Sequence, residues 1–143
     1  MLVTNKVLLD RAKAGSYAVG AFNINNLEFV QAITSAAEEL RSPAILAVSE
    51  GAIKYAGFEN LVSMVRTVSE NLEIEVSLHL DHGKDMAVIE KCITGGFTSV
   101  MIDGSHLPFE ENIAVTREVV EKAKPGGLSV EGELGRLAGI EDN

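Results

Sequence analysis

Hydrophobic residues along the chain follow two alternating spacings. Short runs in which apolar and polar positions alternate are separated by longer segments in which apolar residues recur every three or four positions. The first spacing is typical of β-strands and the second of amphipathic helices, so their regular alternation predicts βα units around a parallel sheet. The strands are expected at residues 18–22, 43–48, 74–81, 98–103 and 128–134.

Helix signals occupy the segments between these strands. A leading helix is expected over residues 4–14, and Asn25 with Glu28 three residues later has the spacing of a capping box at the start of the next. Gly95-Gly96 and Pro125-Gly126-Gly127 are helix stops. The expected buried stripes of three helices are Leu61, Val65, Val68, Leu72; Met86, Ile89, Cys92; and Phe109, Ile113, Thr116, Val120, Ala123.

Five strands fit two architectures. An open doubly wound sheet would be complete, whereas a (β/α)₈ barrel needs eight strands and about 250 residues. Alternate positions of the third strand separate Leu78 and Leu80 from His79 and Asp81. Helices cover both faces of a doubly wound sheet but only the outer face of a barrel, so polar faces favour the barrel. Residues 1–143 are therefore expected to form the N-terminal part of one barrel domain.

Three carboxylates are predicted to converge. Asp81, Asp103 and Glu133 lie at or near the carboxyl ends of neighbouring strands with matching parity, where barrel enzymes keep their active sites. Such a group requires a divalent metal, a cationic substrate or a basic side chain such as Lys84 nearby. His82 has the opposite parity and joins the group only if the strand breaks there. Residue type leaves open whether His82 is a metal ligand or a hydrogen-bonded structural residue.

Other candidate residues have less specific patterns. Ser49 follows the second strand and either offers a hydroxyl to a phosphate or occupies an ordinary turn. Asn23 follows the first strand and either binds a ligand or caps a helix. His106 is expected to be an exposed loop residue. Cys92, the single cysteine, cannot form an internal disulfide and is expected in the core.

Composition narrows the possible partners. With 46% hydrophobic and 23% charged residues, a chain of 143 residues has enough apolar material for a core. The formal charge of −9 and the lack of basic clusters argue against nucleic acid and against anionic membranes. No run approaches the roughly 20 apolar residues of a membrane span, and residues 1–10 lack the features of a signal peptide. A cytoplasmic location is expected.

Several motifs together resemble one enzyme family. Residues 76–83, VSLHLDHG, are similar to the first signature of class II fructose-bisphosphate aldolases, an apolar strand that ends in HxDH. Residues 130–135, VEGELG, and residues 138–142, AGIED, are similar to the second. Segments 21–26, 96–105 and 107–112 also read as members of that family do. The resemblance covers essentially the whole chain and identifies it as the N-terminal half of a member.

The resemblance implies a TIM barrel and a reversible, zinc-dependent lyase reaction of glycolysis and gluconeogenesis. Fructose 1,6-bisphosphate would be cleaved to dihydroxyacetone phosphate and glyceraldehyde 3-phosphate. His82 matches a ligand of the catalytic zinc, and Asp81 matches the acid that protonates the aldehyde oxygen during condensation. Asp103 and Glu133 match positions that bind a second or alternately placed metal ion. A second divalent metal or a monovalent cation therefore remains an open alternative.

The resemblance also implies roles around the substrate. Ser49 matches a contact to a substrate phosphate, Asn23 a residue that positions substrate, and Glu141 a glutamate for proton transfer at the ketone carbons. The family suggests a homodimer or homotetramer. Ala138 departs from the glycine usual in the second signature, a small-for-small change expected to be tolerated.

Length is the larger departure. The family takes two more zinc-ligand histidines from the second half of its barrel, so these 143 residues alone are expected to show no aldol cleavage, even with zinc. Two alternatives remain. Tagatose-bisphosphate aldolase shares every motif named above. A catalytically inactive half-barrel could instead serve as an interaction module that pairs its open sheet edges with another chain.

Overall fold

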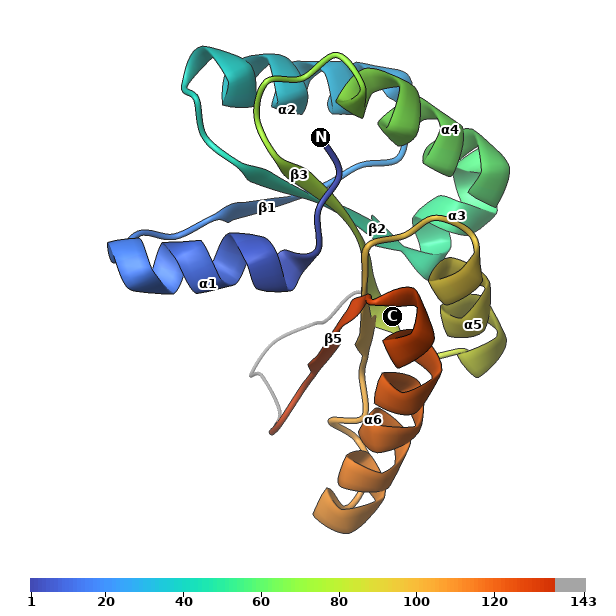
Figure 1. The fold of residues 1–143 in the computed structure, drawn as a ribbon. Coiled ribbons are helices and arrows are strands. Elements are labelled where there is room, and N and C mark those ends of the chain that lie inside the picture. The colour runs from blue at the N-terminus through green and yellow to red at the C-terminus, as the bar shows by residue number, and fades with distance from the viewer. Residues whose placement is uncertain (136–143) are drawn as a thin grey trace.

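A computed structural model describes residues 1–135 of the chain (Figure 1). Five parallel strands form one sheet in chain order. They are β1 (Gly20–Asn23), β2 (Ala44–Ser49), β3 (Val76–Gly83), β4 (Ser99–Ile102) and β5 (Ser129–Gly132). The helices are α1 (Asn5–Gly15), α2 (Leu27–Glu39), α3 (Glu50–Ala56), α4 (Phe58–Ser69), α5 (Met86–Thr94), α6 (Phe109–Ala123) and the 3₁₀ turn η1 (Lys124–Gly126).

The strand order distinguishes the two expected architectures. A doubly wound sheet reverses its strand order at a switch point and carries helices on both faces. Here the order is β1-β2-β3-β4-β5, and helices α2 to α6 form an arc around one side of a curved sheet (Figure 1). Helix α1 lies on the opposite side, where Ser77 Oγ of β3 donates to Asn5 Oδ1 at 2.5 Å. This arrangement is that of a barrel segment with α1 against its inner face.

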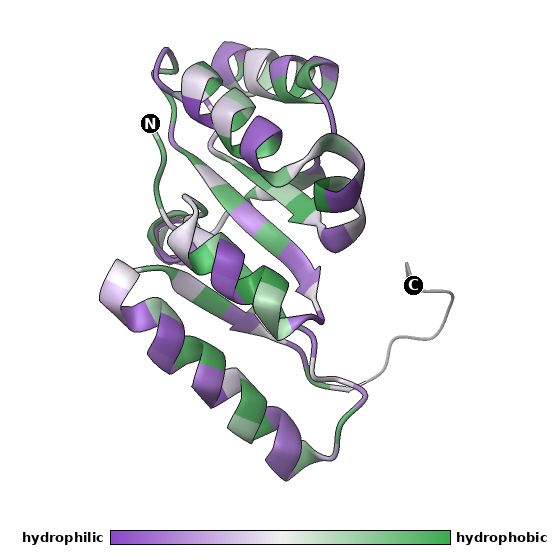
Figure 2. Ribbon diagram, turned by 90° about the vertical axis from the view of Figure 1, so that its right-hand side faces the viewer, coloured by the Kyte–Doolittle hydropathy of each residue, from purple (hydrophilic) through white to green (hydrophobic). Residues whose placement is uncertain are grey.

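The two faces of the sheet differ as the alternation predicts. Leu78 and Leu80 are completely buried between β3 and the surrounding helices. Ser77 and His79 are also buried but belong to the inner, polar face, where they make hydrogen bonds. Figure 2 shows the same alternation of hydrophobic and hydrophilic positions along the central strand. Polar side chains therefore fill positions that branched apolar residues usually occupy in barrels.

Local details correct four expectations. The N-cap of α2 is Asn26 rather than Asn25, because it is the Asn26 side chain that accepts from the Phe29 amide at 2.9 Å. Leu72 lies beyond the end of α4. Helix α3 is absent from the sequence prediction, since seven residues are too few to display a helical period. Every strand boundary differs from the predicted one by one or two residues.

Helix α6 buries only part of the stripe predicted for it. Ala123 is buried as predicted, but Phe109 is 61% exposed and Val120 is 41% exposed. Asn112 and Val119, which the prediction left out, are buried. Phe109 and Val120 are exposed because they line an open groove beside β5 instead of the core. The error therefore has a cause outside the helix, in the open edge of the sheet.

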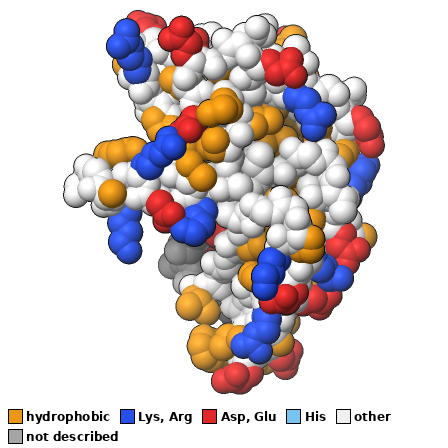
Figure 3. Space-filling model, viewed as in Figure 1, with side chains coloured by type: hydrophobic (Ala, Val, Ile, Leu, Met, Phe, Trp, Pro, Cys, Tyr) orange, Lys and Arg blue, Asp and Glu red, His pale blue; other side chains and the backbone are white. Residues whose placement is uncertain are grey.

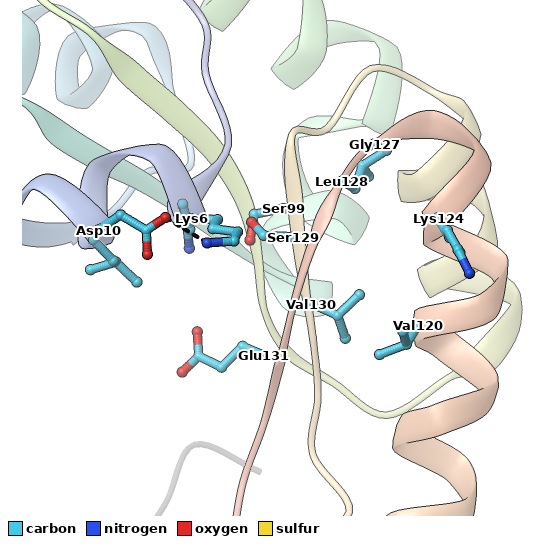
Figure 4. A pocket seen from close by; sticks show the side chains of 12 residues that line it. Lys6, Asp10, Ser99, Val120, Lys124, Gly127, Leu128, Ser129, Val130 and Glu131 are labelled. Carbon is cyan, nitrogen blue, oxygen red and sulfur yellow. Dashed lines mark hydrogen bonds and ion pairs between the residues drawn. The ribbon is translucent and has the colours of Figure 1, made fainter.

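Within residues 1–135, the edge strands β1 and β5 each pair with another strand on one side only. Beside β1, a groove is lined by Phe22, Ile33 and Leu40, and hydrophobic side chains gather over this region in Figure 3. Beside β5, a larger groove separates that strand from α1, and Figure 4 shows Glu131 directed toward α1 and Val130 toward α6. Within residues 1–135, no helix has the length and apolar character needed to cross a membrane.

Candidate metal centre and active site

A bulge near the end of β3 determines where His82 points. Leu80 pairs with Val100 and Gly83 pairs with Ile102, so β3 has one residue more than β4 in this interval. His82 takes the left-handed backbone conformation, with φ of 47°. Such a conformation is uncommon for residues other than glycine, although histidine adopts it more readily than most. The bulge re-aims the side chain, so that His82 joins the face that carries Asp81.

Three potential ligands converge at this end of the sheet. His82 Nδ1 lies 3.5 Å from Asp103 Oδ2 and 3.6 Å from Glu133 Oε2. Within the described part of the chain, these three residues are the group whose donor atoms all lie within 4.8 Å of one another. Asp103 and Glu133 follow the last residues of β4 and β5, so three neighbouring strands each contribute one ligand.

The donor set fits a divalent cation. Nitrogen and oxygen ligands bound at about 2.1 Å in a tetrahedron lie about 3.4 Å apart, close to the two separations that His82 makes. Imidazole with two carboxylates suits zinc and related transition metals. A cation would also offset the repulsion between the two carboxylates.

Asp103 is held with one oxygen available. The hydroxyl of Ser105 donates to Asp103 Oδ1 at 2.7 Å and the Ser105 amide donates to the same atom at 3.1 Å. Oδ2 is the oxygen that faces His82. Burial raises the pKa of Asp103, but the two hydrogen bonds from Ser105 and the proximity of His82 outweigh it and hold the pKa below its ordinary value. The side chain is therefore maintained as a carboxylate aimed at the cluster.

Asp81 lies beside the cluster without joining it. Its Oδ1 is 4.0 Å from His82 Nε2, on the side of the imidazole away from Asp103. Asn23, at the end of β1, donates from Nδ2 to Asp81 Oδ2 at 3.4 Å. The Asp81 carboxylate is thus partly exposed at the mouth of the half-barrel and contacts two of the other predicted site residues.

Four other residues were singled out in the sequence, and the structure describes two of them, Ser49 and His106. Ser49 ends β2 directly opposite Asp81 of β3, at the same rim. Its hydroxyl accepts from the Ala52 amide at 3.1 Å and so caps α3, which leaves the hydroxyl proton available for another partner. His106 is exposed, as expected. Glu141 and Ala138 lie outside the described residues.

A polar layer beneath the cluster was missed as part of the site. His79 is buried, with Nδ1 2.9 Å from Ser99 Oγ and Nε2 3.3 Å from Glu131 Oε2. The hydrogen bond to His79 is the main reason that the pKa of Glu131 falls below its ordinary value. Strand parity placed these residues inward, but it gave no sign that they pair.

Two further contacts support the ligands. Asn112 of α6, which is buried, donates from Nδ2 to the carbonyl oxygen of Glu133 at 2.7 Å and so fixes the chain where β5 ends. Ser105 secures Asp103 as described above. The D-x-S spacing of Asp103 and Ser105 is a recognisable turn signal, whereas nothing local to Asn112 indicated its distant partner.

The chain matches a family model described as fructose-bisphosphate aldolase class-II over residues 3–143. The fructose-bisphosphate aldolase of Geobacillus stearothermophilus is 54% identical over 145 residues, which cover 99% of this chain and 50% of that protein. That of Thermus caldophilus is 53% identical over 143 residues, which cover 100% of this chain and 47% of that protein. The chain therefore spans about half the length of the curated relatives it matches.

Solved structures give the same result for the fold. The YdjI aldolase from Escherichia coli K12 superimposes with a TM-score of 0.90 at 36% identity, covering 94% of this chain and 53% of that structure. A putative fructose-1,6-biphosphate aldolase from Coccidioides immitis gives 0.88 at 37% identity, covering 96% and 48%. These neighbours are TIM barrels, so the predicted fold class is confirmed: the five strands are part of a (β/α)₈ barrel.

Proposed function

Because the chain belongs to the class II fructose-bisphosphate aldolase family, we propose that it forms the first half of a metal-dependent enzyme that reversibly cleaves fructose 1,6-bisphosphate. The products would be dihydroxyacetone phosphate and glyceraldehyde 3-phosphate. The observation that carries the proposal is the convergence of His82, Asp103 and Glu133, with Asp81 alongside, at the carboxyl end of the barrel strands.

His82 would hold the catalytic ion, together with ligands from the second half of the barrel. Asp103 and Glu133 would hold the same ion at another stage, or a second divalent ion, because their oxygens lie 3.5 and 3.6 Å from His82 Nδ1. When bound, a zinc ion is a Lewis acid that stabilises negative charge on the oxygens of the dihydroxyacetone phosphate fragment. A monovalent cation is the other cofactor that the resemblance leaves open.

Asp81 would carry the proton of the aldehyde oxygen. Cleavage removes a proton from the hydroxyl that becomes the aldehyde, and condensation returns it, so the residue alternates between base and acid. Its position beside the cluster, 4.0 Å from His82 Nε2, suits a group that acts on substrate next to the ion. The amide of Asn23, 3.4 Å from Asp81 Oδ2, would orient that carboxylate and the bound sugar.

Ser49 would donate its hydroxyl proton to a phosphate of the substrate, because its oxygen already accepts from the Ala52 amide. Glu141 would transfer the proton at the ketone carbons, as its match to the family implies. A phosphorylated sugar as substrate accords with the cytoplasmic location expected from the sequence. Assembly into a homodimer or homotetramer remains part of the proposal.

The chain spans about half of its curated relatives, so the proposed activity is that of a complete barrel protein, in which this chain is followed by the second half of the barrel. That protein should cleave fructose 1,6-bisphosphate in a coupled dehydrogenase assay, lose activity when chelated and regain it with zinc. Tagatose 1,6-bisphosphate is tested in parallel, because preferential cleavage of that sugar would indicate the alternative, a tagatose-bisphosphate aldolase. Full activity in the metal-free protein would refute the proposal. If neither sugar is cleaved, the alternative of a catalytically inactive interaction module would be favoured instead.

A further inference from the structure

Glu50 makes a contact that no pattern in the sequence indicated. It is the first residue of α3, immediately after Ser49, yet its side chain reaches the segment that follows β3. One carboxylate oxygen, Oε1, accepts from the Lys84 amide and from the Asp85 amide, each at 2.7 Å. Hydrogen bonds of this length to a carboxylate are charge-assisted and stronger than neutral ones. Glu50 therefore links the start of α3 to the connection between β3 and α5 through two hydrogen bonds.

That connection begins directly after the bulge that contains His82. The left-handed φ of 47° at His82 is intrinsically unfavourable for a residue with a Cβ, so the surrounding contacts must maintain it. On one side, β3 pairs with β2 and β4 up to the bulge. On the other side, the Asp103 amide donates to the Gly83 carbonyl at 2.9 Å. The next two amides along the chain, those of Lys84 and Asp85, donate to Glu50.

We propose that Glu50 is a positioning residue that holds the His82 bulge and thereby directs the imidazole toward Asp103 and Glu133. The inference rests on the proposed function insofar as it assigns those three residues to a metal. Glu50 itself is outside the group of convergent donors found among residues 1–135, so it acts through the backbone rather than as a ligand.

The Glu50 carboxylate acts on the His82 ring through the backbone between them. Without Glu50, the Lys84 and Asp85 amides would donate their hydrogen bonds to water instead, because both residues are exposed. The backbone could then relax from the left-handed conformation toward an extended one. By strand parity, an extended His82 projects to the face opposite Asp81 and leaves the cluster. Loss of a group that orients a ligand typically weakens metal binding by 10- to 100-fold.

Glu59 offers a matched control. It also lies in the first turn of a helix, α4, and its carboxylate accepts from Lys91 Nζ at 3.0 Å at the surface. Glu59→Ala therefore removes one acidic side chain and one contact from the same protein without touching the bulge. Glu50→Gln keeps an acceptor oxygen of similar reach but removes the charge.

The test uses the complete barrel protein. Zinc affinity is measured by competition with a chromophoric chelator, and hydrogen exchange at the Lys84 and Asp85 amides is measured by NMR. We expect Glu50→Ala to weaken zinc binding at least 10-fold and to accelerate exchange at those two amides. Glu50→Gln should fall between the wild-type protein and Glu50→Ala, and Glu59→Ala should match the wild type.

Unchanged zinc affinity in Glu50→Ala, or an equal loss in Glu59→Ala, would overturn the proposal, as would unchanged exchange at both amides. If Glu50→Ala does not fold, wild-type affinity in Glu50→Gln overturns it, and intermediate affinity supports it. A wild-type protein that binds zinc but cleaves no sugar bisphosphate would refute the proposed function alone, since the affinity comparison would still decide the role of Glu50.

Discussion

Gly83 occupies a position with no room for a side chain. A Cβ added there would lie 2.5 Å from the carbonyl oxygen of Met101, 2.9 Å from Leu80 Cδ2 and 3.0 Å from Ile89 Cγ1. The nearest of these atoms belongs to the backbone of β4, which cannot retreat without disturbing the hydrogen bond from the Asp103 amide to the Gly83 carbonyl. Overpacking of this kind lowers the free energy of unfolding by about 1–3 kcal/mol. Because the nearest obstacle is backbone, Gly83→Ala should lie at the upper end, about 3 kcal/mol.

Gly51→Ala is the matched control for Gly83→Ala. Gly51 lies within α3, where an added Cβ would be 3.6 Å from Ser49 Oγ, an ordinary contact. Alanine in a helix should raise stability by about 0.5–1 kcal/mol. The free energy of unfolding in urea and the melting temperature are measured for both variants. Gly83→Ala should lower the melting temperature by about 10 °C, at roughly 3 °C per kcal/mol. Equal stability of the two variants would refute the packing described at the bulge.

Three other predictions concern the core, the cysteine and the isolated chain. Leu80→Ala should lower the free energy of unfolding by about 3 kcal/mol because Leu80 is completely buried, whereas Leu40→Ala, at an exposed site, should change it by less than about 0.5 kcal/mol in the same urea titration. Burial raises the pKa of Cys92 to about 12, so the folded 143-residue chain should not react with Ellman's reagent at pH 8 and should release one equivalent of thiolate product after denaturation. The 143-residue chain alone should show no aldol cleavage with added zinc, and measurable turnover in the coupled assay would contradict the need for a second half.

Much of the fold could be predicted from local sequence because it depends on local periods. The alternation that separates Leu78 and Leu80 from His79 and Asp81 is a property of the extended chain itself. It also favoured the barrel over the doubly wound sheet, since helices cover only the outer face of a barrel and leave the inner face free for polar groups. The buried face of α6 could be predicted only in part, because Phe109 and Val120 face an open groove beside β5 rather than the core.

The candidate site likewise contains residues that strand parity could place and residues that only long-range contacts determine. Parity brought Asp81, Asp103 and Glu133 to one face, and the structure places all three at the same rim of the sheet. The position of His82 depends on a register shift between β3 and β4, which no single strand encodes. Glu50 accepts hydrogen bonds from Lys84 and Asp85, which lie 34 and 35 positions later in the chain, and Asn112 contacts Glu133 from a different element. Only the folded chain reveals these contacts.

The central claim is that His82, Asp103 and Glu133 bind the metal while Asp81 carries a proton. The most direct test is Asp81→Asn in the complete barrel protein, with bound zinc and the rate of fructose 1,6-bisphosphate cleavage measured on the same samples. The variant should keep its zinc, because Asp81 lies outside the cluster, and should lose cleavage by a factor of about 10² to 10⁴. A variant that cleaves at the wild-type rate, or that loses its zinc, would contradict the assignment.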